Sequence, residues 1–211
     1  AEEVIRERLF AHCPEHAIVG EEFDDSRPEG ATHCWYIDPI DGTKAFIRGV
    51  PLYGTLLGLE IDGRVALGVV YFPALDEMVY AADGHGTYWN GRRTQVRQTQ
   101  TLSKAFVGCT DSATFDKYDK GKQWKALEAA TYYRCGWSDA YGHALVATGR
   151  LELMVDPIMN AWDCGPFPVI LREAGGYFGD WSGNESIHAG EAISTTQQLL
   201  PEVLETIEVA K

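Results

Sequence analysis

The sequence predicts an α/β fold in which β-sheets and helices stack in layers. The first half of the chain is rich in apolar segments of strand length, and the second half alternates such segments with helical ones. A chain of 211 residues can bury a full core in one large domain or two small ones. The composition changes around 99–104, so we expect a strand-rich α+β half at 1–103 and an α/β half at 104–211.

The first half opens with a helix and continues with short strands. A helical pattern runs from the start of the chain to about Cys13, and Pro14 ends it. The Asp62-Gly63 pair between two apolar runs predicts a β-hairpin, because these residues readily adopt the positive φ angles of a tight turn. We expect this sheet to be antiparallel. Its strands are predicted at 17–19, 34–37, 55–61, 65–72, 78–82 and 86–90.

Strands and helices alternate in the second half. Gly175-Gly176 follows the apolar run 169–171 and is expected to end that helix, since glycine readily adopts the left-handed conformation found at helix C-termini. Strands are predicted at 106–109, 151–155 and 192–194. Helices are predicted at 122–130, 140–147, 163–174 and 201–209.

Charge, cysteine and histidine content narrow the class of protein. The chain has 31 acidic and 18 basic residues, and its net charge of −13 argues against nucleic acid or an anionic membrane as the main partner. No apolar run reaches membrane-spanning length, and we expect no signal peptide. The five cysteines form no C-x-x-C pair, so we interpret them as reduced core residues of a cytoplasmic protein. The histidines lack metal-ligand spacing, and we expect His143 to be a packed or surface residue of its helix.

The most informative motif is the segment DPIDGT at 38–43. It follows the apolar run 34–37, so a strand delivers its first carboxylate. The proline lacks an amide hydrogen and disfavours helix before it, the glycine lets a ligand approach the backbone, and Thr43 can cap a following helix. Asp38 and Asp41 therefore project from a sharp corner with free N–H groups behind them. This arrangement suits a divalent cation facing a phosphate.

This corner has two other interpretations. Asp-Pro and Asp-Gly pairs also occur in purely structural turns. The haloacid-type phosphatase signature contains Asp-Gly-Thr as well, but there a single residue separates the two aspartates, whereas two residues separate Asp38 from Asp41. That spacing argues against an aspartyl-phosphate nucleophile.

Two more carboxylates can complete a site. Glu21 stands at the end of the strand predicted at 17–19, and Asp163 stands at the start of a predicted helix. Asp163 could equally be a simple helix N-cap. If it faces Asp38 and Asp41, the group provides all-oxygen ligands for a hard cation such as Mg²⁺.

Three blocks of the sequence are characteristic of one known family. They are Gly20–Glu22, Trp35–Thr43, and Trp162-Asp163 with Glu173–Gly176. Together they resemble the inositol monophosphatase family of magnesium-dependent, lithium-sensitive phosphatases, and the match covers the chain nearly end to end. Further segments resemble the histidinol-phosphate phosphatase branch of that family: Thr43–Pro51, Asp139–Gly142, Val146–Gly149 and Met154–Pro157.

The resemblance implies a fold and a set of partners. The fold is an αβαβα sandwich of the sugar-phosphatase type, whose N-terminal helix and mobile metal-loop segment we expect to precede residue 1. In the family, an aspartate from that segment supports the threonine that matches Thr43. The implied partners are a small phosphorylated substrate and a second copy of the chain in a homodimer, with no nucleic acid and no membrane.

The resemblance also assigns roles to individual residues. Glu21 and Thr43 would orient the attacking water, and the amides of Gly42 and Thr43 would hold the phosphate. Two or three Mg²⁺ ions per site are implied, with Li⁺ as an inhibitor. Their ligands would be Glu21, Asp38, Asp41, Asp163 and the carbonyl of Ile40.

Two further aspartates bear on the choice of substrate. The implied reaction is hydrolysis of L-histidinol phosphate to L-histidinol and phosphate, a step of histidine biosynthesis, by direct transfer to metal-activated water. Asp156 falls where the family has a substrate-reading acid, and Asp139 falls on the opposite rim, although it could also be a helix N-cap. Both would complement the ammonium and imidazole groups of histidinol phosphate, whereas an inositol ring offers only hydroxyls.

Two alternatives remain open. The chain could be an inositol-1-phosphate or broad sugar phosphatase, because an acidic side chain also accepts hydrogen bonds from hydroxyls. It could also be an inactive or weak family member, or a fragment, that acts through oligomer contacts. Release of phosphate from the two substrate types separates these hypotheses.

Overall fold

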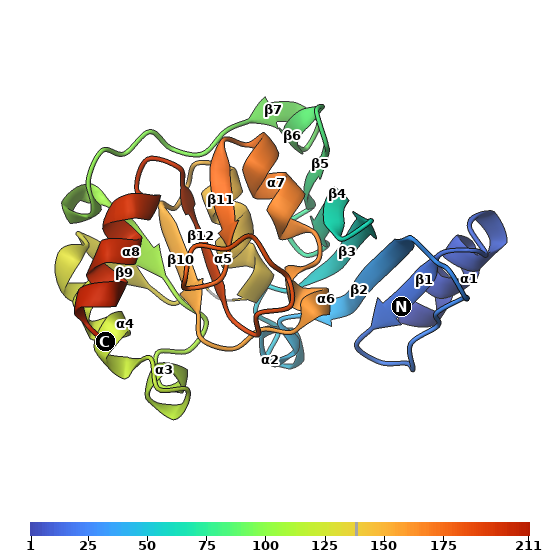
Figure 1. Cartoon of the computed structure of the whole chain (residues 1–211), viewed down its shortest axis with the longest axis horizontal. Helices are drawn as coiled ribbons and strands as arrows, with labels where there is room; N and C mark the ends of the chain where they lie inside the picture. The colour runs from blue at the N-terminus through green and yellow to red at the C-terminus, as the bar shows by residue number, and fades with distance from the viewer. Residues whose placement is uncertain (138) are drawn as a thin grey trace.

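Two β-sheets and the helices packed on them make up the fold (Figure 1). The structure is a computed structural model that describes residues 1–137 and 139–211. The larger sheet is complete before the smaller one begins along the chain, so the expected boundary near 103 falls between them. One hydrophobic cluster nevertheless joins residues of both halves, and the division into two domains stays a prediction.

The larger sheet contains seven strands in chain order. β1 runs parallel to β2, so the expectation of a purely antiparallel sheet was wrong at this edge, where the 21–32 loop carries the chain back to the start of β2. The predicted hairpin is confirmed, with positive φ angles of 49° and 81° at Asp62 and Gly63. The strands, of which β7 was not predicted, are β1 (Ala17–Gly20), β2 (His33–Asp41), β3 (Gly54–Ile61), β4 (Arg64–Phe72), β5 (Glu77–Ala82), β6 (Gly86–Trp89) and β7 (Arg92–Thr94).

The smaller sheet has the strand order β11-β12-β10-β8-β9. The β10–β8 and β8–β9 pairs are parallel, and β12 is antiparallel to both of its neighbours. Gly175, with φ 82°, ends the helix before β11, as predicted. The chain then enters β11 directly, and this strand was not predicted because it begins and ends with glycine. The short β9 was also missed. The strands are β8 (Phe106–Gly108), β9 (Tyr133–Cys135), β10 (Leu153–Asp156), β11 (Gly176–Gly179) and β12 (Ala192–Thr196).

One predicted helix was wrong in its extent. The segment 163–174 is two helices, because Pro166 and Pro168 lack the amide hydrogens that a continuous helix would need at this point. The short α3 and the 3-10 helix η1 were not predicted. The helices are α1 (Glu2–His12), α2 (Thr43–Ile47), η1 (Leu102–Lys104), α3 (Thr114–Lys117), α4 (Gly121–Ala130), α5 (Asp139–Ala147), α6 (Ala161–Cys164), α7 (Phe167–Glu173) and α8 (Leu200–Val209).

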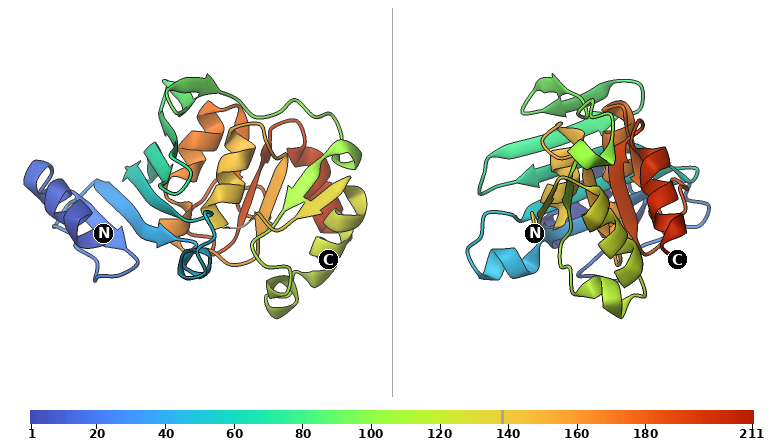
Figure 2. Two further views of the ribbon diagram at one scale, coloured as in Figure 1. Left: turned by 180° about the vertical axis from the view of Figure 1, so that it is seen from behind. Right: turned by 90° about the vertical axis from the view of Figure 1, so that its left-hand side faces the viewer.

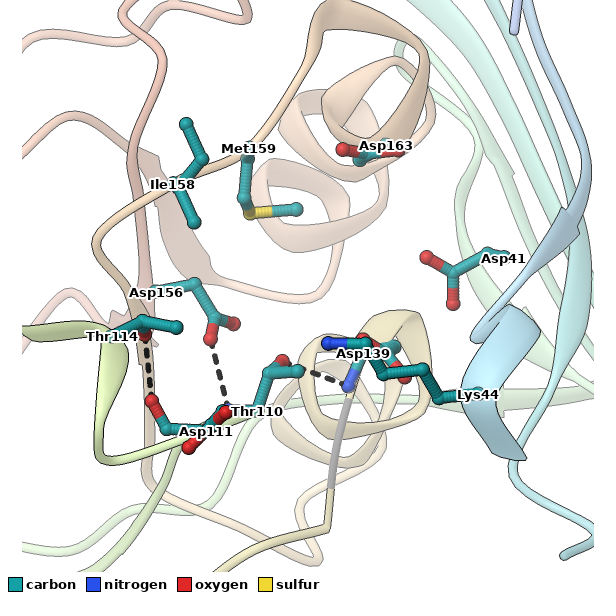
Figure 3. A pocket seen from close by; sticks show the side chains of 10 residues that line it. All are labelled: Asp41, Lys44, Thr110, Asp111, Thr114, Asp139, Asp156, Ile158, Met159 and Asp163. Carbon is teal, nitrogen blue, oxygen red and sulfur yellow. Dashed lines mark hydrogen bonds between the residues drawn. The ribbon is translucent and has the colours of Figure 1, made fainter. Parts of the chain in front are cut away.

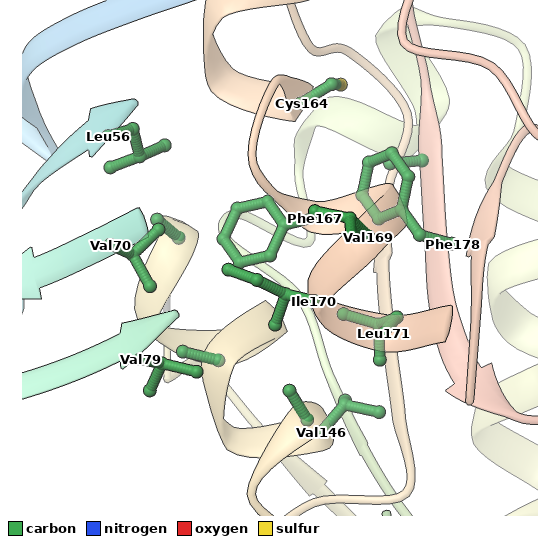
Figure 4. Close-up of a cluster of buried hydrophobic side chains, with 14 of the residues drawn as sticks. Leu56, Val70, Val79, Val146, Cys164, Phe167, Val169, Ile170, Leu171 and Phe178 are labelled. Atoms are coloured by element: carbon green, nitrogen blue, oxygen red, sulfur yellow. The ribbon is translucent and has the colours of Figure 1, made fainter. Parts of the chain in front are cut away.

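The elements stack as sheet, helix, sheet, helix. Helices α5 and α7 lie between the two sheets, and α4 and α8 cover the other face of the smaller sheet (Figure 2). The contact between the layers is apolar: Leu56 and Val70 of the larger sheet meet Phe167 and Ile170 of α7, and Phe178 of β11 closes the cluster (Figure 4). All these side chains are buried. Removal of their apolar surface from water is the main favourable contribution to the free energy of folding.

Two other expectations concern membrane-spanning segments and the state of the cysteines. No helix in the described part of the chain is long and apolar enough to cross a membrane. All five cysteines are free, with Cys109 and Cys164 buried and the other three half-buried. The structure therefore places the five cysteines without a disulfide, their reduced state stays a prediction, and their description as core residues holds fully for two of them.

A pair of glycines seats the α6–α7 corner on the larger sheet. Gly58 of β3 and Gly68 of β4 are partners in the ladder. A Cβ atom on Gly58 would come within 2.4 Å of the Gly165 carbonyl oxygen, and one on Gly68 within 2.2 Å of the Pro166 carbonyl oxygen. The backbone of the corner therefore approaches the sheet as closely as only glycine permits, which fixes where α6 lies.

We expect Gly58→Ala to destabilise the protein by about 1–3 kcal/mol, the usual range for forcing an atom into a packed region. Gly136→Ala is the matched control, because no atom lies within 4 Å of the position of its added methyl group and its backbone is not left-handed. Urea unfolding of both variants measures the difference. Equal stability of the two would contradict this account of the corner.

Candidate active site

The end of β2 delivers two buried aspartates. The β2–β3 register shifts between Asp38 and Asp41, so the strand is irregular where the proline interrupts its hydrogen-bond ladder. Asp38 accepts a hydrogen bond from the Ile40 amide at 2.9 Å, and Thr55 Oγ1 donates to the Pro39 carbonyl at 2.9 Å. These bonds stabilise the corner, and both carboxylates stay within the protein, with 3% and 8% of the two residues exposed.

The third aspartate comes from α6. Asn160 is the N-cap of this helix and Asp163 is its third residue, with the Asn160 amide donating to Asp163 Oδ2 at 2.7 Å. The simple N-cap interpretation of Asp163 was therefore wrong, because the cap belongs to Asn160 and Asp163 completes a capping box. The carboxylates of Asp38, Asp41 and Asp163 each place an oxygen within 4.8 Å of the others.

Glu21 approaches this cluster from the neighbouring strand. It directly follows β1, which is parallel to β2, so both strands end at the same edge of the sheet. The Glu21 amide donates to the Ile37 carbonyl at 3.2 Å. Glu21 is exposed as a residue, but partial burial of its carboxylate is the largest cause that raises its pKa; a hydrogen bond with Asp38 opposes this shift, and the charge of Asp163 adds to it. Glu21 therefore joins the three aspartates electrostatically.

Burial is the largest influence on the electrostatics of this group, and the like charges of its members add to it. Burial raises the pKa of Asp38 to about 10, and the charges of Asp41, Glu21 and Asp163 add to it. Burial likewise raises the pKa of Asp41 well above its usual range, with the charge of Asp139 as the next cause. The pKa of Asp163 is also raised by burial. In a protein without a bound cation, such a group retains protons, and a cation that replaces those protons fits the all-oxygen donor set.

The turn after Asp41 leads through Gly42 into the short helix α2. Gly42 precedes α2 with φ 77°, and a Cβ atom there would lie 2.7 Å from the Leu52 carbonyl oxygen and 3.2 Å from Asp139 Oδ2. Thr43 is the first residue of α2 and not its cap, and its Oγ1 donates to the Ile40 carbonyl at 3.1 Å. The predicted capping role of Thr43 was therefore wrong, since its hydroxyl is used inside the corner.

A cavity of about 180 Å³ opens beside the cluster (Figure 3). Asp139 and Asp156 both line it, together with Asp41 and Asp163, so the structure brings these four predicted residues to one cavity. The Ala140 amide donates to Asp41 Oδ2 at 2.9 Å, and this bond connects the start of α5 to the group of three aspartates. The remaining lining residues are Lys44, Thr110, Asp111, Thr114, Ile158 and Met159.

Hydrogen bonds organise the wall of this cavity. The Thr110 amide donates to Asp156 Oδ1 at 2.9 Å, and Thr110 Oγ1 accepts from the Asp139 amide at 3.0 Å. Asp139 is the first residue of α5, with φ 53°, a conformation that aspartate tolerates better than most residues. The carboxylate of Asp156 and the backbone of Asp139 are thus held by contacts with Thr110, which the sequence pattern does not reveal.

Sequence reasoning missed several residues of this wall. Thr110 stands just after β8, as Asp38 stands just after the strand predicted at 34–37. This position after a strand was the signal that could have identified it. Lys44 was named only as part of a family segment. His143 is fully buried, with Nδ1 2.7 Å from Ser194 Oγ and Nε2 3.3 Å from Asp156 Oδ2, so the packed alternative of its prediction is confirmed.

Comparisons with known proteins identify the family. A model of the inositol monophosphatase family matches residues 1–210. The sequence is 42% identical to a histidinol-phosphatase of Chlorobaculum parvum, over 92% of this chain and 74% of that protein. It is 32% identical to an inositol-1-monophosphatase of Rhizobium meliloti, over 99% and 80%. The solved inositol monophosphatase of Anabaena has a TM-score of 0.91 at 27% identity and is matched over 100% of this chain and 85% of its own. The chain therefore belongs to the inositol monophosphatase family and is a phosphatase with that mixed α/β fold.

Proposed function

We propose that this phosphatase hydrolyses L-histidinol phosphate to L-histidinol and phosphate with the help of Mg²⁺. The observation that carries the proposal is the convergence of Asp38, Asp41 and Asp163, whose oxygens lie within 4.8 Å of one another beside the cavity. Buried carboxylates this close repel each other and a phosphate dianion alike. Their grouping in a phosphatase is useful only if cations neutralise them.

The metal-holding residues would be Glu21, Asp38, Asp41, Asp163 and the carbonyl of Ile40. Mg²⁺ accepts oxygen ligands and, when bound, supplies positive charge that lowers the pKa of water and stabilises a departing oxygen. The Ile40 carbonyl accepts one hydrogen bond from Thr43 and keeps a second lone pair for a ligand. We propose that two or three Mg²⁺ ions bind per site and that Li⁺ inhibits the enzyme.

The remaining steps fall to the protein's own groups. The amides of Gly42 and Thr43 would bind the phosphate oxygens, where charge is spread in the transition state. Glu21 and the Thr43 hydroxyl would orient the attacking water in line with the leaving oxygen. Two residues separate Asp38 from Asp41, whereas a single residue separates the two aspartates of the aspartyl-phosphate signature. Neither aspartate is therefore assigned as a nucleophile, and the phosphoryl group is transferred directly to water.

Two carboxylates support the choice of substrate. Asp139 and Asp156 line the same cavity as Asp41, so a substrate whose phosphate lies at the cluster would extend towards them. Their charges suit the ammonium and imidazole groups of histidinol phosphate. A relative 42% identical to the chain also bears the name histidinol-phosphatase, which favours participation in histidine biosynthesis.

Inositol phosphate or a range of sugar phosphates is the second candidate. A relative 32% identical to the chain is named inositol-1-monophosphatase, and carboxylates can accept hydrogen bonds from ring hydroxyls. We also propose a cytoplasmic homodimer, in keeping with the free cysteines and with the family resemblance. A weak or inactive member that acts through oligomer contacts would release no phosphate from either substrate.

Phosphate release with and without Mg²⁺ tests the proposal. We expect histidinol phosphate to be hydrolysed with a kcat/KM at least about tenfold above that for inositol 1-phosphate, because two carboxylates face its cationic groups. A malachite-green assay of both substrates measures this ratio. A higher kcat/KM for inositol 1-phosphate would favour the second candidate, and no release from either substrate would refute both enzyme proposals.

The Asp41→Asn substitution tests the metal assignment. Turnover should fall by about 10³-fold or more, since one cation ligand loses its charge. The fold should remain intact, because an amide oxygen can still accept the hydrogen bond from Ala140. Phosphate release and circular dichroism report the two effects, and near-native rates with Mg²⁺ would show that the assignment is wrong.

The Asp156→Asn substitution tests substrate recognition. We expect KM for histidinol phosphate to rise about tenfold, the effect of losing one charge-assisted contact, with little change in KM for inositol 1-phosphate. Steady-state kinetics of both substrates provide the measurement. A parallel rise for the two substrates would show that Asp156 does not read the cationic groups.

The pH dependence of stability follows from the raised pKa values. Asp38 has a pKa of about 10 in the metal-free fold and an ordinary low value when unfolded, so the folded state binds more protons between these limits. The stability of the metal-free protein therefore falls as the pH rises through that window. Bound Mg²⁺ replaces the protons, so the gain in Tm on adding Mg²⁺ should be larger at about pH 8 than at about pH 6. Thermal denaturation measures both gains, and a larger gain at the lower pH would contradict the assignment.

A further inference from the structure

A buried glutamate in α1 has no role in the site described above. Helix α1 lies next to β1, an edge strand of the larger sheet, and also contacts β2 (Figure 1). Glu2, the first residue of the helix, is completely buried, although it is charged and most other α1 residues are exposed. A buried carboxylate is costly unless it is paired and hydrogen-bonded, so its contacts indicate what it does.

Both oxygens of Glu2 are engaged. Oε1 accepts from Arg6 Nε at 2.6 Å, and Oε2 accepts from the Glu22 amide at 2.8 Å. Gly20 provides the space, since a Cβ atom there would lie 2.0 Å from Glu2 Oε1. The carboxylate therefore contacts the chain on both sides of Glu21.

Arg6 extends the same contact along the turn. Its Nη2 donates to the Phe23 carbonyl and its Nη1 to the Asp24 carbonyl, each at 3.2 Å. The guanidinium also lies 5.8 Å from the centre of the Phe23 ring, within the range of a cation–π contact. The planar guanidinium can serve these acceptors and Glu2 together, which a lysine ammonium could not do with the same geometry.

We propose that Glu2 and Arg6 act as positioning residues that hold the turn 20–24, and with it the carboxylate of Glu21, against Asp38. This inference rests on the proposed function, in which Glu21 is a metal ligand. Glu21 itself is exposed, and its own backbone contact is a hydrogen bond from its amide to Ile37, so its neighbours must fix where its side chain starts. Pre-organising a ligand lowers the entropy lost when the cation binds.

A purely structural attachment of α1 gives a different result. It would lower the thermal stability of the metal-free protein on substitution and leave metal affinity unchanged. Positioning of Glu21 instead predicts weaker Mg²⁺ binding, with kcat preserved at saturating Mg²⁺, because the bound ion then holds Glu21 where it orients the attacking water. The Mg²⁺ concentration at the midpoint therefore separates the two roles.

The experiment compares Arg6→Gln and Gly20→Ala with the wild type in the full chain. Arg6→Gln removes the bonds to Phe23 and Asp24, and Gly20→Ala displaces Glu2 from the other side. Both should raise the Mg²⁺ midpoint about tenfold, the usual effect of losing a group that orients a metal ligand. The midpoint is measured by isothermal titration with Mg²⁺ alone and by phosphate release, with kcat at saturating Mg²⁺ kept within about twofold.

Arg8→Gln is the matched control, since Arg8 is an exposed arginine of the same helix. Its midpoint should equal that of the wild type. Unshifted midpoints for Arg6→Gln and Gly20→Ala, beside a wild type that binds Mg²⁺ and an Asp41→Asn variant that does not, would overturn the positioning role and leave the proposed function intact. Absence of Mg²⁺ binding by the wild type would overturn both.

Discussion

Repulsion among carboxylates in a water-poor corner is the constraint on which the site depends. Asp38 and Asp41 are almost fully buried and share their surroundings with Asp163 and Glu21. Their raised pKa values show how unfavourable it is to ionise all of them without a compensating charge. If a divalent cation binds there, as we propose, the same unfavourable energy is released on binding, so the cost in stability and the capacity for metal would be one property.

Backbone geometry, more than side-chain packing, brings these groups together. The end of β2, where the register shifts, carries two aspartates whose oxygens lie within 4.8 Å of each other. The glycine pair Gly58 and Gly68 lets the Gly165-Pro166 backbone lie directly on the sheet, and Asn160 then sets the start of the short helix that carries the third aspartate. Each device is local, but together they join segments more than a hundred residues apart in the sequence. The buried cluster between the sheets holds these segments in place.

The sequence predicted the parts of the site that depend on local pattern. Asp38 and Asp41 were recognisable from the strand and proline-glycine corner around them, and the alternation of strands and helices indicated the layered fold. Whether Asp163 reaches that corner is a question of packing, which no local pattern answers. The same holds for His143, whose partners come from other elements, and for Glu2, whose position in an ordinary helical pattern gives no sign that it is buried. Local pattern therefore did not reach the residues that act through tertiary contacts: the family resemblance alone assigned a firm role to Asp163, and nothing in the sequence indicated the partners of His143 or the burial of Glu2.

We propose that the carboxylate cluster binds divalent cations where phosphate is transferred. A crystal structure of the full chain grown with Mn²⁺, an ion whose anomalous scattering locates it directly, tests this claim. We expect anomalous peaks liganded by Asp38, Asp41 and Asp163, with a further ligand from Glu21. Carboxylates that pair with one another in the presence of Mn²⁺, with no anomalous peak among them, would contradict it.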